Sequence, residues 1–284
     1  MKKSSETILR ILCKDGPGII ARISGLVSDY GGNILAMEQH SEEDSGLFAA
    51  RLHIERLKEI KNIEGEMVQN NPFQQFQYWL DDFNKKLNVA VLVTKEETCL
   101  YDILIKQQLG ELNCDIPLII SNREDLKTIA KQFSIPFHYL PIDKNNPQDQ
   151  EQKISDLLNK HQIDLTLLAR YMRILSPSFV QKRLGKIINI HHSFLPAFKG
   201  ANPYRQAWER GVKMIGATAH YVTDDLDEGP IIHQSVTQVN HQYSVQELIR
   251  AGRELERMVL AQAVRAHLEH RVLLLGKRTI VFHF

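Results

Sequence analysis

Short apolar runs separated by longer mixed stretches dominate the sequence after residue 86 and restrict its fold more than any other feature. The runs cover residues 89–93, 116–120, 165–169 and 187–190. Continuous apolar runs of this length are typical of strands buried on both faces of a parallel sheet. The stretches between them are long enough for helices, and alternating strands and helices build an open, doubly wound sheet. The sequence therefore predicts an α/β domain over residues 87–284.

The first 86 residues follow a different pattern, and we expect them to form a smaller domain over 1–86. In chain order the expected elements are a strand over 7–13, a helix from 19 to 30, strands over 33–37 and 46–54, a helix over 60–69 and a strand over 74–80. Turn residues separate the first strand from the first helix, and a Gly-Gly pair ends that helix. This βαββαβ order predicts a four-stranded sheet with its helices on one face. The polar stretch 81–86 is the candidate linker.

Composition excludes several classes of protein. A length of 284 residues suits two domains, each large enough for its own core. The 35 Lys and Arg residues against 34 Asp and Glu leave a net charge of +1, so we expect no nucleic-acid partner. Three separate cysteines without a Cys-x-x-Cys pair predict neither a disulfide framework nor a thiolate metal site. No apolar stretch is long enough to cross a membrane, so we expect a soluble, cytoplasmic protein without a membrane partner.

Polar residues gather at the end of the last apolar run, from Asn189 to Pro196. Side chains alternate along a strand, so Asn189 and His191 share one face, while His192 points to the other. The carboxyl ends of strands are where open α/β sheets bind ligands. An amide beside an imidazole suits a carbonyl whose oxygen gains negative charge during attack. A histidine that only stabilises the fold is the competing interpretation.

A second cluster of polar residues is acidic and lies within residues 224–228. Most of these carboxylates suit a solvated turn. Asp227 differs because a Gly-Pro pair fixes a sharp turn beside it, so its carboxylate can accept a proton from water or hold a protonated His191. Ser193 has no Gly-x-Ser-x-Gly surroundings, so direct attack by water or an amine is favoured over an acyl-enzyme.

Three strings of residues carry a resemblance to a known family. They are LARYMRILSP over 168–177, NIHHSFLPAFKG over 189–200 and HYVTDDLDEGPII over 220–232. In this order and spacing they resemble the 10-formyltetrahydrofolate-dependent formyltransferases, whose domain is Rossmann-like with a mostly parallel open sheet. The resemblance runs from about residue 87 to 284. It implies that Asn189, His191 and Asp227 are the catalytic residues, with no metal and no cofactor besides the folate substrate.

The resemblance also implies where the folate binds. The backbone of one segment matches the stretch that lines the family's folate pocket, and its residues are Met172, Arg173, Ile174 and Leu175.

The first domain resembles an ACT domain, a ferredoxin-like module that often binds amino acids and pairs with a second copy. An ACT domain before a formyltransferase-like domain resembles the formyltetrahydrofolate deformylase family. The candidate contacts for an amino-acid effector are Asp15 and Gly18, at the first strand–helix turn, and Asn33, which follows the Gly-Gly turn. Glycines that merely make tight turns are the competing explanation. We expect a homo-oligomer.

The resemblance implies an enzyme that hydrolyses 10-formyltetrahydrofolate to formate and tetrahydrofolate. Such a reaction balances one-carbon pools and supplies formate for purine biosynthesis. In the expected mechanism Asn189 and His191 hold the formyl oxygen, and Asp227 orients or deprotonates the attacking water. His191 then donates a proton to N10 of the leaving tetrahydrofolate.

Two alternatives belong to other classes of function. One is formyl transfer to an amine acceptor such as glycinamide ribonucleotide, and the other is a non-catalytic sensor of folate and amino acids. The segment 94–100 lacks the glycines that let backbone amides approach a phosphate, and it carries Glu96 and Glu97. This disfavours a phosphoribosyl acceptor. A sensor would not need an amide, an imidazole and a carboxylate together.

Overall fold

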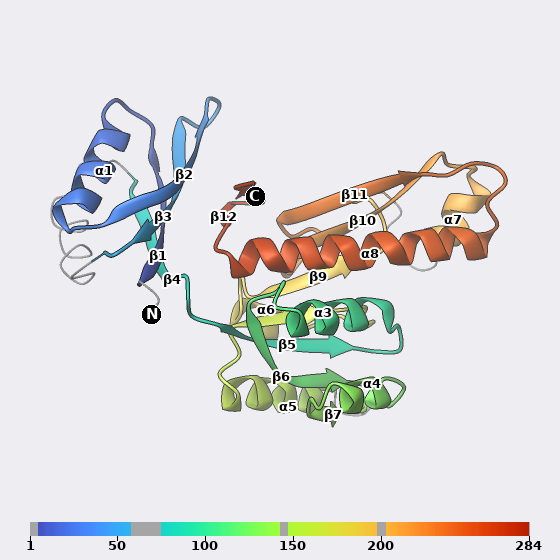
Figure 1. The fold of residues 1–284 in the computed structure, drawn as a ribbon. Coiled ribbons are helices and arrows are strands. Elements are labelled where there is room, and N and C mark those ends of the chain that lie inside the picture. The colour runs from blue at the N-terminus through green and yellow to red at the C-terminus, as the bar shows by residue number, and fades with distance from the viewer. Residues whose placement is uncertain (1–4, 58–74, 143–146, 198–202, 284) are drawn as a thin grey trace. The chain divides into compact units, whose positions relative to one another are not determined.

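The structure is a computed structural model of the 284-residue chain, shown in Figure 1. It describes residues 5–57, 75–142, 147–197 and 203–283. The chain divides into two compact units, one of Met1–Lys85 with Glu269–Leu273 and Ile280–Phe284, the other of Lys86–Leu268 with Leu274–Thr279. Among the described residues, no helix is both long and apolar enough to span a membrane.

The first unit contains an antiparallel sheet of four strands with the order β2-β3-β1-β4. Its elements are β1 (Glu6–Lys14), α1 (Ile19–Asp29), β2 (Asn33–Glu42), β3 (Leu47–Glu55) and β4 (Gln77–Asp82). The expected ferredoxin-like sheet is confirmed. β4 extends into the stretch expected to be a linker. The helix expected over 60–69 lies outside the described residues.

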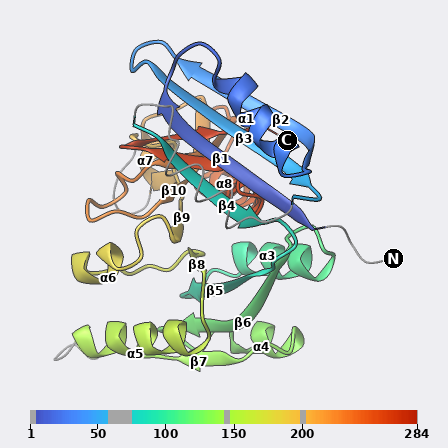
Figure 2. The ribbon, with the colours of Figure 1, turned by 90° about the vertical axis from the view of Figure 1, so that its left-hand side faces the viewer.

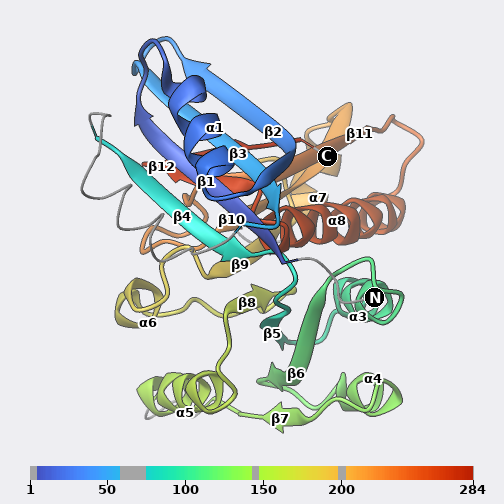
Figure 3. The ribbon, with the colours of Figure 1, turned by 60° about the vertical axis from the view of Figure 1, so that its left-hand side comes forward.

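Helix α1 covers one face of this sheet (Figure 2 and Figure 3). Leu9 and Ile11 alternate along β1 and pack in one core with Ile23 and Val27 of α1. Residues between them in sequence, such as Arg10, therefore belong to the other face.

On that other face, two arginines hold the C-terminal segment Glu269–Leu273. Arg10 and Arg51 are direct partners in the pairing of β1 with β3. The Nη1 of Arg10 donates to the carbonyl of Val272 at 2.9 Å. Arg51 donates to the carbonyls of Glu269 at 2.9 Å and His270 at 3.2 Å. From the sequence we expected every residue after 86 to belong to the second domain. The sequence could not show that this segment belongs to the first unit, because the link depends on hydrogen bonds between residues more than 200 positions apart in the chain.

The second unit contains a seven-stranded sheet with the order β11-β10-β9-β8-β5-β6-β7. Its first elements are β5 (Leu87–Val93), α3 (Thr98–Gln108), β6 (Cys114–Ser121), α4 (Lys127–Gln132), β7 (Phe137–Tyr139), α5 (Pro147–Lys160) and β8 (Leu165–Leu168). They are followed by α6 (Pro177–Gln181), β9 (Ile187–His191), α7 (Pro203–Glu209), β10 (Met214–Tyr221), β11 (Ile231–Gln238) and α8 (Val245–Leu268). A separate hairpin consists of β12 (Val272–Leu275) and β13 (Arg278–Val281).

The predicted mostly parallel α/β fold is confirmed, because all of the apolar runs form strands of this sheet. The strands from β9 through β8, β5 and β6 to β7 are parallel. Beyond β9 the pairing changes, since β10 runs antiparallel to both β9 and β11. The three-residue β7 was not expected from the sequence, because so short a strand leaves no periodic pattern.

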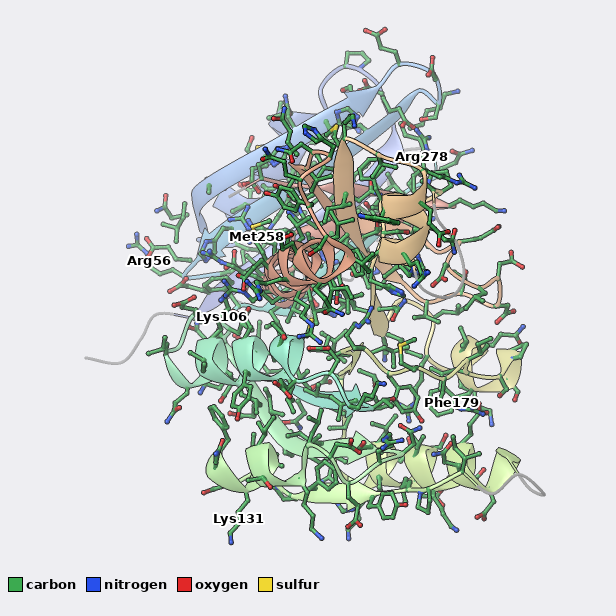
Figure 4. The ribbon with its side chains drawn as sticks, turned by 90° about the vertical axis from the view of Figure 1, so that its right-hand side faces the viewer. Arg56, Lys106, Lys131, Phe179, Met258 and Arg278 are labelled. Carbon is green, nitrogen blue, oxygen red and sulfur yellow. The ribbon has the colours of Figure 1, made fainter. Side chains whose placement is uncertain are left out.

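Helices cover both faces of this sheet, which explains why its strands are continuously apolar. Ile154 and Leu158 of α5 and Phe179 of α6 pack on Leu92 and Leu168. The long helix α8 contacts β9, β10, β11 and α3 (Figure 1). Side chains on the outer sides of the helices point away from the sheet, as Lys131 of α4 does in Figure 4.

Two local features of the second unit concern the start of helix α8 and the order of the strands. Helix α8 begins at a capping box, in which Ser244 Oγ accepts from the N–H of Glu247 at 3.3 Å and the Glu247 carboxylate accepts from the N–H of Ser244 at 2.7 Å. The strand order also reverses direction between β5 and β8. The carboxyl ends of these two strands flank a topological switch point, where open sheets bind their ligands.

Candidate active site

A pocket of about 310 Å³ opens at the carboxyl ends of β8 and β9. It is lined by the three predicted catalytic residues Asn189, His191 and Asp227 and by the predicted folate segment Met172–Leu175. The side chains of Met172 and Ile174 are largely exposed, whereas Leu175 is buried. The structure therefore brings these two groups of predicted residues into one cavity.

Asp227 lies at the centre of the polar residues in this pocket. Its Oδ2 is 3.2 Å from Nδ1 of His191, and its Oδ1 is 3.5 Å from Nδ2 of Asn189. Its backbone has a φ of 56°, in the left-handed region that side chains rarely adopt. The turn that holds it needs Gly229, because a Cβ there would lie 1.7 Å from the carbonyl oxygen of Tyr221. The expected sharp turn thus fixes the carboxylate against the end of β9.

The electrostatics of the pocket keep Asp227 ionised. Burial by itself raises the pKa of the Asp227 carboxyl, but hydrogen bonds and charge from His191 and His220 lower it well below its usual range. The acid therefore stays a carboxylate at neutral pH. His191 is buried, and within the described part of the chain its Nε2 has no hydrogen-bond partner. A buried imidazole with one nitrogen engaged and the other open suits proton transfer to a bound molecule.

His220 is a site residue that the sequence analysis did not assign. It lies on β10 directly opposite Asn189, with its Nε2 at 3.2 Å from Asn189 Nδ2 and 3.6 Å from Asp227 Oδ1. The backbone carbonyl of Tyr221 lies 2.9 Å from the Nδ1 of His220. Only the antiparallel pairing of β9 with β10 reveals this neighbour. A histidine within a mostly apolar segment was the available signal.

The position of His192 differs from the one expected from the sequence, which placed it on the opposite face from His191. Strand β9 ends at His191, so strand alternation no longer applies to the next residue. His192 lines the same pocket, and its ring centroid is 5.2 Å from that of His191. Burial lowers the pKa of His192 to about 3, and the charges of Arg170 and His191 act in the same direction. His192 is therefore a neutral imidazole in the pocket.

The segment predicted to bind folate is anchored to the ends of neighbouring strands. The N–H of Met172 donates to Oγ1 of Thr94 at 3.1 Å, and that hydroxyl donates to Oδ1 of Asn122 at 2.9 Å. Thr94 directly follows β5 and Asn122 follows β6. The carboxyl ends of three strands thus fix the backbone that lines the pocket. Arg170, in the same connection, also lines the pocket and was missed by the sequence analysis.

The predicted effector residues of the first unit lie at two ends of its sheet. Asp15 follows the last residue of β1, and its Oδ1 accepts from the N–H of Gly16 at 2.8 Å. Gly18 caps α1 with a φ of 84°. Asn33 instead pairs with Glu55, and Glu55 pairs with Glu6 at the opposite end of β1. The nine residues of β1, at about 3.3 Å each, separate the two places by roughly 25 Å. The structure does not bring Asn33 together with Asp15 and Gly18 in one chain.

Neither the pocket nor the rest of the described chain offers a metal site. No group of three or more His, Cys, Asp and Glu side chains among the described residues has the arrangement to hold a metal ion. Cys13, Cys99 and Cys114 are all free and buried.

Comparison with known proteins identifies both parts of the chain. The formyl transferase family model matches residues 87–264, and the ACT domain model matches residues 7–69. A formyltetrahydrofolate deformylase from Synechocystis sp. is 50% identical over 99% of this chain and 100% of that protein.

Solved structures give the same relationship. A formyltetrahydrofolate deformylase from Pseudomonas syringae pv. tomato is 39% identical, with a TM-score of 0.94 over 100% of this chain and 96% of that one. A glycinamide ribonucleotide transformylase from Symbiobacterium toebii is 28% identical, with a TM-score of 0.65 over 75% of this chain and 97% of that one. The full-length match, which includes the ACT domain, shows that this chain belongs to the formyltetrahydrofolate deformylase family.

Proposed function

We propose that the protein hydrolyses 10-formyltetrahydrofolate to formate and tetrahydrofolate. The observation that carries this proposal is the geometry of His191, whose Nδ1 lies 3.2 Å from the Asp227 carboxylate while its buried Nε2 has no partner among the described residues. A fixed imidazole of this kind takes a proton from attacking water and returns one to a leaving nitrogen. The full-length relationship to deformylases supports the same reaction.

The roles of the three residues follow from their partners. Asn189 supplies an amide N–H as a donor to the formyl oxygen, where negative charge develops in the tetrahedral intermediate. Asp227 accepts from His191 and carries the negative charge that stabilises an imidazolium. Its strongly lowered pKa makes it a weak base, so the carboxylate orients water and His191 rather than removing a proton itself. His191 then protonates N10 as the C–N bond breaks.

The residues after β5 support water rather than a phosphoribosyl amine as the acceptor. Glu96 accepts from the hydroxyl of Thr98 at 2.9 Å and forms an ion pair with Arg253 at 2.7 Å. A carboxylate at this place repels a phosphate, and Arg253 is already engaged by it. The segment has no glycine whose backbone amides can approach an anion closely.

The test of this function compares reactions with and without an amine. The purified protein is incubated with 10-formyltetrahydrofolate alone and with added glycinamide ribonucleotide, and formate and formylated amine are both measured. We expect the same rate of formate release in both reactions. Formylation of the amine as the main reaction, or binding without turnover, contradicts the proposal.

We further propose that the ACT domain binds a small amino-acid effector at the turn between β1 and α1. Gly18 leaves open space around its Cα, and the first N–H groups of α1 suit the carboxylate of an amino acid. Asn33 contributes to the same effector only from a second copy of the chain, which links this proposal to a homo-oligomer. Formate released under such control supplies purine biosynthesis in the cytoplasm.

A further inference from the structure

A buried ion pair beside the pocket has no place in the mechanism described so far. Arg170 lies two residues beyond β8 and lines the pocket together with His191 and His192. Its partner is Glu256 of α8, which is only 1% exposed, and Arg170 Nε lies 3.4 Å from Glu256 Oε2. Like Asp227, Arg170 has a left-handed backbone, with a φ of 60°. Strained residues of this kind gather at functional sites.

The guanidinium of Arg170 is held in place, but not all of its N–H groups have hydrogen-bond partners. Within the described chain, its Nε and Nη1 are buried without a hydrogen bond, and so is Oε2 of Glu256. Arg51 in the first unit is also buried, yet it donates hydrogen bonds to two carbonyls and a carboxylate. Buried donors without partners are rare in folded proteins and are typical of a site that receives a ligand.

The position of Glu256 is fixed from its other side. The hydroxyl of Tyr204 donates to Oε1 of Glu256 at 2.5 Å. Gly252, one turn earlier on α8, makes room for this contact, because a Cβ there would lie 2.0 Å from the Tyr204 oxygen. The ring of His192 lies near both this cluster and the proposed catalytic residue, 6.1 Å from the Tyr204 ring and 5.2 Å from the His191 ring.

The charges at this end of the pocket suit a small anion. Arg170 is a permanent cation, and His192 beside it is neutral because burial and the charge of Arg170 lower its pKa to about 3. Arg173, the other arginine that lines the pocket, is exposed. Burial raises the pKa of Glu256, and the charge of Arg170 opposes that rise.

Hydrolysis, unlike transfer, produces such an anion. The oxygen of water forms a bond to the formyl carbon, the bond from that carbon to N10 breaks, and N10 takes a proton. The resulting formic acid loses its remaining acidic proton to solvent and becomes formate. Transfer to an amine instead gives a neutral formamide, for which a fixed cation has no use.

We propose that Arg170 binds the formate released by the reaction, and that Glu256 and Tyr204 position the guanidinium for this purpose. The inference rests on the proposed function and adds a carboxylate subsite to it. Guanidinium groups bind carboxylates through paired N–H donors, which a lysine does not reproduce.

The direct test measures formate binding to the full-length protein without substrate. Isotope-labelled formate is titrated with the protein, and its NMR line width is followed at constant ionic strength. We expect Arg170→Gln to weaken binding about tenfold or more, with Arg170→Lys in between. The matched control is Arg173→Gln, which removes the exposed arginine of the same pocket and is expected to leave the formate Kd within about twofold.

A double variant protects the test against misfolding. Arg170→Gln alone leaves a buried carboxylate without its cation, whereas Arg170→Gln with Glu256→Gln removes both charges, and the second change keeps the shape of the Glu256 side chain. The double variant is expected to fold and to lose formate binding. Formate binding that stays unchanged in the double variant overturns the proposal, as does a wild-type protein that does not bind formate.

Kinetics separate this inference from the proposed function. Formate is added as a product inhibitor of hydrolysis, and its inhibition constant is expected to rise about tenfold in Arg170→Gln and to stay within about twofold in Arg173→Gln. Equal rises in both variants contradict a specific subsite at Arg170. A wild type that binds formate through Arg170 but hydrolyses nothing would refute the proposed function while leaving the anion site established.

Discussion

Arg51 in the first unit and Arg170 in the second use buried charge in opposite ways. In the first, Arg51 is 2% exposed and its guanidinium is engaged by Glu38 and by two carbonyls of the C-terminal segment Glu269–Leu273. In the second, polar atoms at the carboxyl ends of the strands are buried without partners among the described residues, including Nε2 of His191 and Nη1 of Arg170. The hydrogen bonds of Arg51 hold the C-terminal segment to the first unit, whereas the unpartnered atoms of His191 and Arg170 lie in the pocket that we expect to meet substrate.

The comparison predicts which variants lose activity and which lose stability. Residues of the pocket affect the reaction strongly and folding weakly. Residues that hold the C-terminal segment do the reverse. A variant that breaks this separation would show that the two kinds of buried charge are not distinct.

The largest expected effect is on Asp227. Asp227→Asn keeps the shape of the side chain but removes the charge that holds His191, so kcat is expected to fall by about 10² to 10⁴ while the protein stays folded. Steady-state hydrolysis of 10-formyltetrahydrofolate measures the loss, and circular dichroism checks the fold. Unchanged turnover would remove Asp227 from the mechanism.

Asn189 distinguishes catalysis from binding in the same pocket. Asn189→Ala removes a donor to the formyl oxygen, so kcat is expected to fall roughly 10²- to 10³-fold. The ratio of the effects on kcat and KM is the measurement. An effect confined to KM would make Asn189 a binding residue only.

Sequence patterns predicted the strands of the second unit well because those strands are buried on both faces and follow one another closely. The sequence also predicted Asn189, His191 and Asp227, which line one pocket, because two of them lie at the end of a strand and the third lies beside a sharp turn. His220 and the pair of Arg170 with Glu256 were not, because they depend on strand pairing and helix packing between distant residues. Asn33 was grouped with Gly18 because it follows the Gly-Gly turn, yet α1 carries the chain back to the other end of the sheet.

Arg51 tests the structural side of the comparison. Arg51→Gln leaves two carbonyls without their donor and removes one of the two arginines that bind the Glu38 carboxylate, the other being Arg271. The free energy of unfolding is therefore expected to fall by about 2–4 kcal/mol. Arg56→Gln is the matched control, because Arg56 has a 64% exposed side chain and its ion pair contributes at most about 1 kcal/mol. Urea denaturation measures both. Equal losses would mean that burial of Arg51 adds nothing.

His192 gives a smaller, pH-dependent effect on stability. Its pKa is lowered to about 3 in the folded protein, against an ordinary value of about 6.5, so as pH falls the unfolded chain takes up a proton first. This histidine therefore lowers the free energy of unfolding by at most about 1.4 kcal/mol per pH unit between pH 6.5 and about 3, and has no effect above that range. His192→Gln is expected to flatten the stability curve between pH 7 and about 5. Parallel curves for the two proteins would contradict a buried neutral imidazole.

The smallest expected effect concerns the ACT domain. Gly18→Val strains a backbone with a φ of 84° and covers the N–H groups of α1, so any response of turnover to glycine or methionine is expected to weaken several-fold. Turnover without effector is expected to match wild type, because Gly18 is far from the pocket in sequence and belongs to the other unit. An unchanged response would move the effector site elsewhere.

The central claim is that water, not an amine, receives the formyl group in the pocket of Asn189, His191 and Asp227. Its most direct test runs the reaction in water enriched in the heavy oxygen isotope and analyses the formate by mass spectrometry. One heavy oxygen in each formate, at a rate independent of added glycinamide ribonucleotide and lost in Asp227→Asn, is the predicted result. Formate without the label, or formyl groups recovered only on the amine, would contradict it.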